Sequence, residues 1–448
     1  MRVAVIGAGI VGVTTAYELA ADGHEVAVFE RRGSAAAETS FANGGVVAPG
    51  YVTPWASPGM PGKVFGHLLS RHAPVRLRPT LNPATVGWLW QWWRACRLET
   101  WQANRAQMQR LAFYSRQRLH ELTHALKLEY ERADGYLVLL RGPEDLALAK
   151  PGLTLLTELK MRFHLIDAPH CRQIEPGLNP ETPLHAGIHL PDDEVGNCRQ
   201  FANLLRTEAQ KLGARFHFHT TVQRIAAGAA PQLVHAYAPP AESTQIMLGP
   251  QTPAQGEPPT EALPFEPVTE QFDAVVVCAA MGAPALLRPL GLRLPLQAVH
   301  GYSITAPLRH LKTYPNHGPR SGLMDERYKV SISRLGSRVR VAGGAEIGGT
   351  PSAYHRSSLD ALYKVLNDWF PGTASMGEAQ RWKGARPMLP DGPPVLGASG
   401  IEGVWLNLGH GSSGWALACG SARVLADQLA GRATAVDTSR LGVGRLVR

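Results

Sequence analysis

The sequence lacks the marks of several specialised protein classes. Its five cysteines are an odd number without a C-x-x-C pair, so we expect neither a disulfide framework nor a zinc site, and a reducing compartment fits. There is no apolar run of about eighteen residues, so we expect no segment that spans a bilayer. Clustered metal ligands and Ser or Cys nucleophile motifs are also missing, so we expect no metal and no protein nucleophile.

Acidic residues are absent from Thr39 to Leu98, whereas basic residues and tryptophans are frequent over residues 60–120. Such a helical segment lies on an anionic membrane surface, packs its tryptophans into a core, or binds nucleic acid. The first two interpretations stay open, and nucleic acid is not expected. The whole chain has a net charge of +9, from 45 Lys and Arg against 36 Asp and Glu.

The overall composition is that of a globular protein. The chain has 448 residues, of which 44% are hydrophobic and 18% charged, enough for about two or three domains. Its 46 Gly and 35 Pro favour many loops and close backbone approaches, as cofactor-binding α/β proteins need.

The N-terminal residues carry a dinucleotide-binding motif. Val3 to Ile6 is an apolar run that predicts a strand, and Gly7, Gly9 and Gly12 fit G-x-G-x-x-G. These glycines permit a sharp turn, close approach of a pyrophosphate and tight helix–strand packing. Glu30 ends the second predicted strand, eighteen residues after Gly12, where an acid accepts hydrogen bonds from ribose hydroxyls.

Regular alternation of strand and helix stops after this unit. A further strand of the same kind appears only at residues 272–282. A nucleotide-binding domain split by long insertions suits FAD better than NAD.

Longer motifs point the same way. They are ETSFANGGVVAPGYVTPWASPG (38–59), LPDDEVGNCRQFA (190–202), HGYSIT (300–305), DERYKVSISRLGSRVRVAGGAEI (325–347), ARPMLPDGPPVLG (385–397) and WLNLGHGSSGWALACGSA (405–422). In these motifs, and from Met1 to about Arg432, the sequence resembles the FAD-dependent D-amino-acid, glycine and sarcosine oxidoreductases. Within that family it is most similar to the bacterial D-amino-acid dehydrogenases, in their small subunit.

The resemblance implies a mixed α/β (α+β) fold. A Rossmann-like FAD-binding domain is interrupted by a substrate or cap domain with a largely antiparallel sheet and helices. We assign the FAD-binding domain to 1–50, 190–227, 271–298 and 385–432, and the substrate domain to 51–189 and 299–384. Residues 228–270, with nine Pro and no Lys or Arg, are interpreted as a Pro-rich surface insertion, and 433–448 as a tail.

The motifs and the resemblance together give the residues expected to hold FAD without a covalent bond. The first Gly loop and the acid after it contact the adenine half, and the 38–59 stretch contacts the flavin. The Gly turn before the last helix offers backbone N–H groups and a helix dipole to negative charge on the reduced flavin. The expected set is Val5, Ile6, Gly7, Ala8, Gly9, Ile10, Val11, Gly12, Glu30, Arg31, Thr39, Ser40, Asn43, Gly44, Gly45, Val222, Gly282, Gly409, His410, Gly411, Ser412, Ser413 and Gly414.

The resemblance also implies the substrate contacts. Arg386 is expected to bind a substrate carboxylate, which its planar fork of donors matches; the alternative is a structural pair with Asp391. Tyr328, and after it Tyr302, is expected to grip that carboxylate or cap the site, with core packing as the alternative for each. His300 stands where related sequences place Lys or Arg, and histidine titrates near neutral pH.

The implied reaction is oxidative deamination of D-amino acids. Hydride passes from Cα to flavin N5, the imino acid hydrolyses to a 2-oxo acid and ammonia, and the electrons pass to a respiratory quinone or similar acceptor. The implied location is the cytoplasmic side of the inner membrane, as a peripheral protein, or the cytoplasm. Alternatives are an oxygen-using glycine- or sarcosine-type oxidase, a D-proline or hydroxyproline dehydrogenase, and, from a different class, a non-catalytic or tRNA-modifying flavoprotein.

Overall fold

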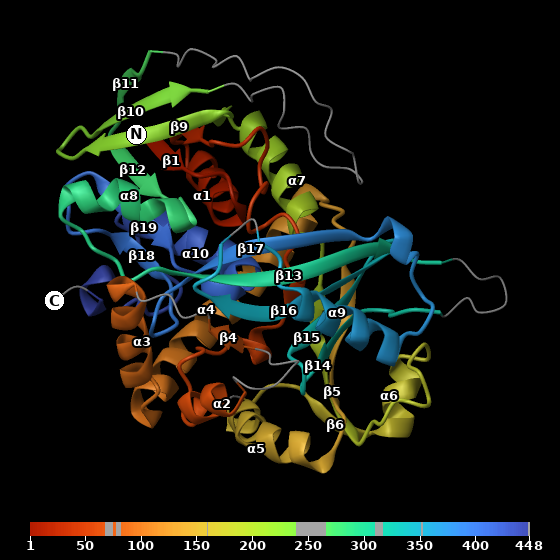
Figure 1. Cartoon of the computed structure of the whole chain (residues 1–448). Helices are drawn as coiled ribbons and strands as arrows, with labels where there is room; N and C mark the ends of the chain where they lie inside the picture. The colour runs from red at the N-terminus through yellow and green to blue at the C-terminus, as the bar shows by residue number, and fades with distance from the viewer. Residues whose placement is uncertain are drawn as a thin grey trace, which may run out of the picture.

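The computed structural model describes residues 1–67, 75–77, 82–158, 160–238, 266–309, 317–350 and 353–446. Its strands form a nucleotide-binding sheet, a small three-stranded sheet and one large sheet (Figure 1). In Figure 1 the first lies above the large sheet, with the N-terminus in it.

The nucleotide-binding sheet has the strand order β18-β19-β12-β1-β2-β8. Neighbouring strands are parallel, except for β18 and β19. Helices α1, α4 (Leu98–Leu126), α7 and α10 share one buried apolar cluster with this sheet. The bounds are β1 (Arg2–Ile6), α1 (Ile10–Ala21), β2 (Glu25–Phe29), α7 (Cys198–Lys211), β8 (Arg215–His217), β12 (Ala274–Val277), α8 (Ala283–Leu287), β18 (Val395–Ala398), β19 (Val404–Leu408) and α10 (Gly414–Leu429).

The small sheet consists of the antiparallel strands β9 (Thr220–Ala226), β10 (Gln232–Tyr237) and β11 (Val268–Gln271). The last two of these strands occupy the ends of the range 228–270, so those ends are a paired hairpin rather than an extended excursion. Residues 239–265, the greater part of the predicted insertion, lie outside the described residues.

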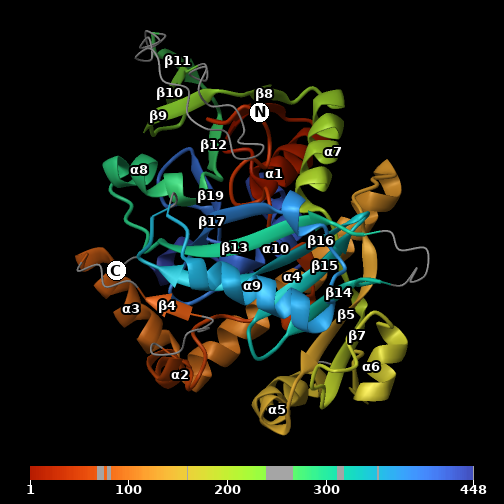
Figure 2. The same ribbon diagram turned by 45° about the vertical axis from the view of Figure 1, so that its right-hand side comes forward.

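The large sheet has the order β17-β13-β16-β15-β14-β5-β7-β3, with β4 beside β16 and β6 beside β7. Its main strands are antiparallel except where β14 meets β5. α9 (Arg356–Trp369) covers one face, with Trp369 and Phe370 in the buried cluster beneath it (Figure 2). The bounds are β3 (Val46–Val47), β4 (Val75–Leu77), β5 (Ala133–Leu140), β6 (His164–Asp167), β7 (Ala186–Val195), β13 (Gln297–Pro307), β14 (Gly322–Asp325), β15 (Val330–Leu335), β16 (Arg338–Ile347) and β17 (Gln380–Met388).

Three of the predicted domain boundaries fall inside strands of this sheet. The boundary at 189/190 cuts β7, that at 298/299 cuts β13 and that at 384/385 cuts β17. Each strand belongs to the large sheet over its whole length, because ladder hydrogen bonds continue across the predicted boundary. The boundaries between the two domains therefore lie at the ends of these strands and not inside them.

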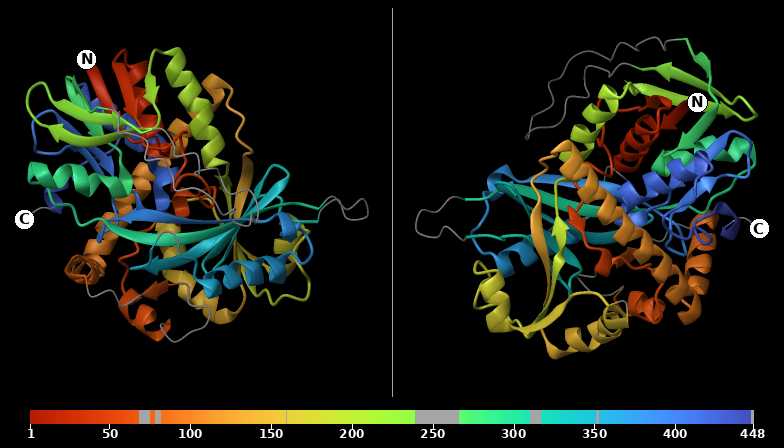
Figure 3. Two further views of the ribbon diagram at one scale, coloured as in Figure 1. Left: turned by 45° about the horizontal axis from the view of Figure 1, so that its top comes forward. Right: turned by 180° about the vertical axis from the view of Figure 1, so that it is seen from behind.

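The basic, Trp-rich segment is mostly helical in its described part, as expected, apart from the short strand β4. It contains α2 (Met60–His67), α3 (Pro83–Ala95) and α4 (Leu98–Leu126), and α4 crosses the back of the molecule beside α10 (Figure 3). Asn82 caps α3, accepting the Ala84 N–H at 2.9 Å, and Pro83 occupies its first turn. The other helices are α5 (Pro143–Glu158), α6 (Ala168–Ile174) and the 3₁₀ turns 49–51, 280–282, 288–290, 376–378, 411–413 and 443–445.

The tryptophans of this segment face in two directions. Trp88 is buried and donates its indole N–H to the Met388 carbonyl at 3.1 Å, whereas Trp90 and Trp93 are 58% and 52% exposed. The core interpretation therefore holds for Trp88, and the membrane-surface interpretation of the exposed Trp90 and Trp93 stays a prediction. No helix in the described part of the chain is long and apolar enough to cross a membrane.

Candidate functional site

In the first Gly loop, Gly7 and Gly12 are packed tightly against the backbone, whereas Gly9 has open space around it. Gly7 has φ of +102° and donates its N–H to the Phe29 carbonyl at 2.8 Å, and a Cβ at Gly12 would overlap the Gly7 carbonyl oxygen. A Cβ at Gly9, by contrast, would meet only Ser40 Oγ, at 3.6 Å. The backbone at the start of α1 is thus left accessible to a phosphate.

Glu30 lies beside this loop, at the end of β2. Its carboxylate accepts the Ala8 N–H at 2.7 Å and the Arg32 N–H at 2.8 Å, and burial raises the pKa of Glu30. Arg31 is held by Glu38, to which it donates from Nε at 3.0 Å. Val222, predicted to contact the adenine, lies on β9 of the small sheet, and Gly282, a further predicted cofactor residue, lies in the 3₁₀ turn after β12.

The loop from Thr39 to Gly45 joins the two domains. Ser40 Oγ accepts the Ile10 N–H at 3.1 Å, while Thr39 donates its hydroxyl to the Ala385 carbonyl of β17 at 2.7 Å. The Gly44 carbonyl accepts from Ser333 Oγ at 2.7 Å. A Cβ at Gly44 would lie 2.9 Å from Ser331 Oγ. Gly44 therefore packs closely on the large sheet, a reason for glycine that the motif alone did not give.

The C-terminal Gly turn reaches the same place from the other end of the chain. Gly409 has φ of +81°, and His410 forms a β-bridge with Met388 at the end of β17. Residues Gly411 to Ser413 form a 3₁₀ turn, and α10 begins at Gly414. This turn places free helix-end N–H groups near Arg386's strand.

The His410 side chain points into the protein. Its Nε2 lies 2.9 Å from Ser421 Oγ, and burial lowers the pKa of His410 to about 3, so the ring is neutral. The imidazole is therefore packed inside the protein, and only the backbone of His410 remains as a predicted cofactor contact.

The register of β17 and β13 sets which side chains share a face of the sheet with Arg386. Arg386 pairs with Val299, Gly384 with Gly301, and Trp382 with Ser303. Because cross-strand partners share a face and neighbours alternate, Arg386 and Trp382 lie on one face of the sheet. It is the face on which the 39–45 loop lies, since Thr305 of that face binds Arg340, whose Nη1 donates to the Asn43 carbonyl at 3.1 Å.

Arg386 has no acidic partner in the described part of the chain. Its Nη1 donates to the Gly344 carbonyl at 2.8 Å, and burial, with no opposing charge, lowers the pKa of Arg386 to about 10. Asp391 instead accepts from Arg445 Nε at 2.8 Å, so the alternative pairing of Arg386 with Asp391 is wrong. A half-buried guanidinium without a carboxylate favours an anionic ligand.

Tyr302 and Tyr328 lie elsewhere. Tyr302 is next to Gly301 and so on the opposite, α9-covered face, where it is buried and donates to Glu346. Tyr328, in the turn between β14 and β15, packs its ring near Arg141, 5.0 Å from its centroid. Strand alternation directs the Tyr302 ring away from Arg386, so the prediction that its hydroxyl grips the carboxylate is corrected. The Tyr328 ring packs against the α9 core, and the role of its hydroxyl stays a prediction.

His300 is buried on the same face as Tyr302. Burial, and then the charge of Lys383, lowers the pKa of His300. Lys383 forms an ion pair with Glu346 at 3.1 Å, in which both side chains are 1% exposed. The His300 side chain therefore lies on the face of the large sheet opposite to the one that carries Arg386.

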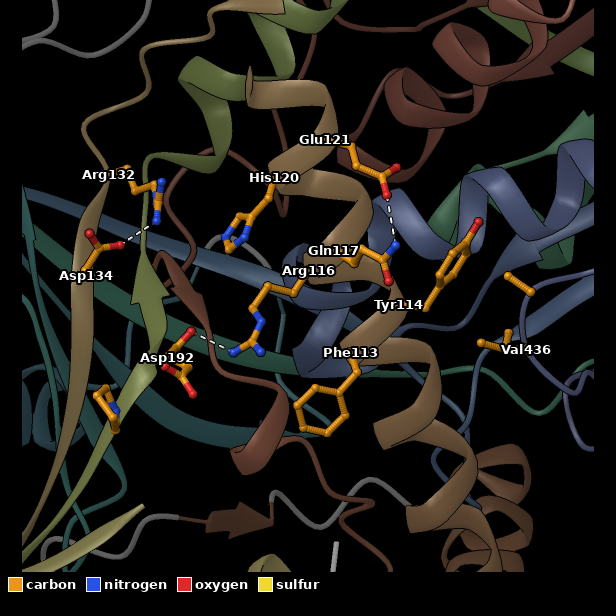
Figure 4. Close-up of a pocket in the computed structure, with 12 residues that line it drawn as sticks. Phe113, Tyr114, Arg116, Gln117, His120, Glu121, Arg132, Asp134, Asp192 and Val436 are labelled. Atoms are coloured by element: carbon orange, nitrogen blue, oxygen red, sulfur yellow. Dashed lines mark hydrogen bonds and ion pairs between the residues drawn. The ribbon is translucent and has the colours of Figure 1, made fainter. Parts of the chain in front are cut away.

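A separate hollow of about 870 Å³ lies between α4, β7 and the C-terminal segment (Figure 4). Arg116, Arg132, Asp134 and Asp192 line it, and none of the predicted site residues does. These charged groups all have ion-pair partners: Arg132 pairs with Asp134, Arg116 with Asp193 and Asp192 with Arg162. We assign no part of the proposed chemistry to it.

Comparisons with known proteins agree with this arrangement. The model of the FAD dependent oxidoreductase family (DAO) matches residues 2–428. The chain belongs to this family. It is 40% identical over 449 residues to a D-amino acid dehydrogenase of Cereibacter sphaeroides, covering 100% of this chain and 96% of the relative. It is 39% identical over 447 residues to one of Rhizorhabdus wittichii, covering 99% and 100%.

Solved structures show the same fold. The glycine oxidase of Geobacillus kaustophilus superposes with a TM-score of 0.70 at 18% identity, covering 100% of this chain and 99% of that one. The iminodiacetate oxidase of Chelativorans sp. BNC1 has a TM-score of 0.68 at 20% identity, covering 98% of each. The expected α/β fold class and FAD as the cofactor are confirmed.

The residues present fit FAD. The Gly loop contacts the 39–45 loop through Ser40, and this loop and the C-terminal turn both contact β17, the strand that carries Arg386. Ser303 also indicates that a ligand binds on this face, because its buried hydroxyl has no hydrogen-bond partner among the described residues. Sequence reasoning missed Ser303, Arg340 and Trp382; the alternation through Gly384 to Arg386 was the available signal for Trp382.

Proposed function

We propose that this FAD-dependent enzyme oxidises D-amino acids to 2-oxo acids and ammonia. Relatives named D-amino acid dehydrogenase match it over its full length. The observation that supports the proposal in this chain is Arg386, a guanidinium without an acidic partner on the face that meets the cofactor loops. An α-carboxylate supplies the missing anion.

Arg386 binds and orients the substrate. Its planar fork accommodates both carboxylate oxygens, so the Cα–H bond takes one direction. The Gly344 carbonyl holds one end of the guanidinium in place. Bound FAD supplies the two-electron acceptor. Positioning is the main task of the protein, and a neutral substrate amine needs no strong base from the chain.

We further propose that the electrons leave to a quinone at a membrane surface. The tryptophan patch, made of Val86, Trp90, Trp93 and Leu98, is exposed on α3 and the start of α4. Trp90 and Trp93 stack with ring centroids 5.1 Å apart, and Arg94 and Arg97 are exposed beside them. Aromatic and basic groups together suit the headgroup level of an anionic bilayer. The protein would then be peripheral, on the cytoplasmic side.

Product analysis tests the proposed reaction. With D-alanine and an artificial dye as acceptor, pyruvate, ammonia and reduced dye should form in equal amounts, and L-alanine should give none. Stoichiometric hydrogen peroxide under air, without the dye, would instead identify an oxygen-using oxidase. Failure of every D-amino acid to reduce the dye would refute the proposal.

A further inference from the structure

On the sheet face that carries Arg386, two adjacent strand positions are glycines and contribute no side chain of their own. Gly301 of β13 and Gly384 of β17 are direct cross-strand partners. The Cβ positions of such a pair lie roughly 4.5–5.5 Å apart. No side chain of these two residues covers the sheet between them.

Arg386 and Trp382 cover this glycine pair from opposite ends. A Cβ at Gly301 would overlap the Arg386 guanidinium, and a Cβ at Gly384 would overlap the benzo edge of the Trp382 indole. The two side chains therefore converge on neighbouring positions, although four residues separate them along β17. A ligand held by the guanidinium has the indole within reach.

Trp382 does not behave as a core residue. Trp88, Trp369 and Trp415 are each buried in an apolar cluster, whereas Trp382 is half-buried and joins no such cluster of the described residues. Its cross-strand partner is Ser303, whose buried hydroxyl has no partner in the described residues. A half-buried indole outside the apolar clusters, on a strand position paired with an unpartnered buried hydroxyl, is typical of a residue that contacts a ligand.

We propose that Trp382 is the specificity-determining wall of the substrate site. It contacts the side chain of the amino acid whose carboxylate Arg386 holds, which rests on the proposed function. The flat apolar indole stabilises apolar and aromatic substituents, and its bulk limits their size next to the Gly301–Gly384 pair.

Two carboxylates that differ by one aromatic ring test this by calorimetry on the FAD-loaded protein. Trp382→Ala should weaken phenylacetate binding roughly tenfold and leave acetate binding unchanged. Trp382→Phe should keep most of the affinity for phenylacetate. Trp90→Ala, on the exposed face of α3, is the matched control and should change neither. Arg386→Met should weaken both ligands, because it removes the group that they share.

Substrate profiles give the second readout. The ratio of kcat/KM for D-phenylalanine to that for D-alanine should fall roughly tenfold in Trp382→Ala and change little in Trp382→Phe. Equal effects of Trp382→Ala on both carboxylates, or an unchanged ratio, would overturn the assignment. If the alanine variant does not fold, Trp382→Leu carries the same comparison. If no D-amino acid is oxidised, the proposed function fails, but the calorimetry still decides the role of Trp382.

Discussion

Asp391 accepts a hydrogen bond from Arg445 Nε at 2.8 Å, and this ion pair removes the acidic group nearest in sequence to Arg386. Arg445 lies in the C-terminal segment that the sequence suggested was a tail. Removing a charge from water without a partner is costly, so the bare Arg386 guanidinium is expected to be kept for a ligand.

Arg386→Met should lower kcat/KM for D-amino acids roughly 30-fold to several thousandfold. This equals a loss of about 2–5 kcal/mol of transition-state stabilisation, because a buried charged contact is removed. The flavin content should not change. Arg381→Met, an exposed arginine on the same strand, is the matched control. Equal kcat/KM in Arg386→Met and Arg381→Met would remove Arg386 from the site.

Gly12→Ala should abolish retention of FAD. Its Cβ would overlap the Gly7 carbonyl oxygen, so the turn that faces the pyrophosphate must move. Gly152→Ala is the control, because a Cβ there meets nothing within 4 Å and α5 is helical at that point. The absorbance of flavin per protein after purification measures the difference, and a fully loaded Gly12→Ala variant would contradict the account of the loop.

Asp193→Asn should stabilise the protein above pH 7. Burial raises the pKa of Asp193 to about 7, although Arg116 lies 3.1 Å from its Oδ1. Because the folded pKa lies above the unfolded one, the wild type should lose stability as pH rises from about 4 to 7, by about 1.4 kcal/mol per unit of pKa shift.

The melting temperature against pH measures this effect. The Asp193→Asn curve should lie near the wild-type curve at pH 4 and above it at pH 8. Asp192→Asn, the exposed neighbour, should follow the wild type throughout. A parallel offset at both pH values would show that the titration of Asp193 is not the cause.

Trp90→Ser with Trp93→Ser should reduce binding to vesicles that contain phosphatidylglycerol. The double change removes the two largest exposed apolar side chains of the tryptophan patch. Flotation at low salt measures binding, and high salt should weaken it because Arg94 and Arg97 contribute. Leu148→Ser, which removes a 60% exposed leucine on α5, should leave flotation unchanged. Wild-type protein that does not float would refute membrane contact.

The local features of the nucleotide site could be predicted from sequence because they depend on short-range sterics. The spacing of Gly7, Gly9 and Gly12, and of Glu30 after them, follows from one strand–turn–helix unit. The pairing of Glu30 with the Ala8 N–H shows how directly that spacing becomes a contact.

The substrate side was harder to predict, because it depends on sheet register and on which face a helix covers. Tyr302 lies one residue from Gly301, and that single step places its ring in the α9 core instead of beside Arg386. Trp382 lies four residues before Arg386, so the same alternation of side chains along a strand places it on the face that carries Arg386. The partner of Asp391 was not predictable either, since Arg445 is distant in sequence.

Anaerobic reduction of the bound flavin tests the central claim most directly. The account predicts that D-alanine or another D-amino acid bleaches the flavin absorbance of the wild-type protein, that the matching L-amino acid does not, and that Arg386→Met slows the bleaching at the same flavin content. A flavin that no D-amino acid reduces, or that D and L forms reduce equally, would contradict it.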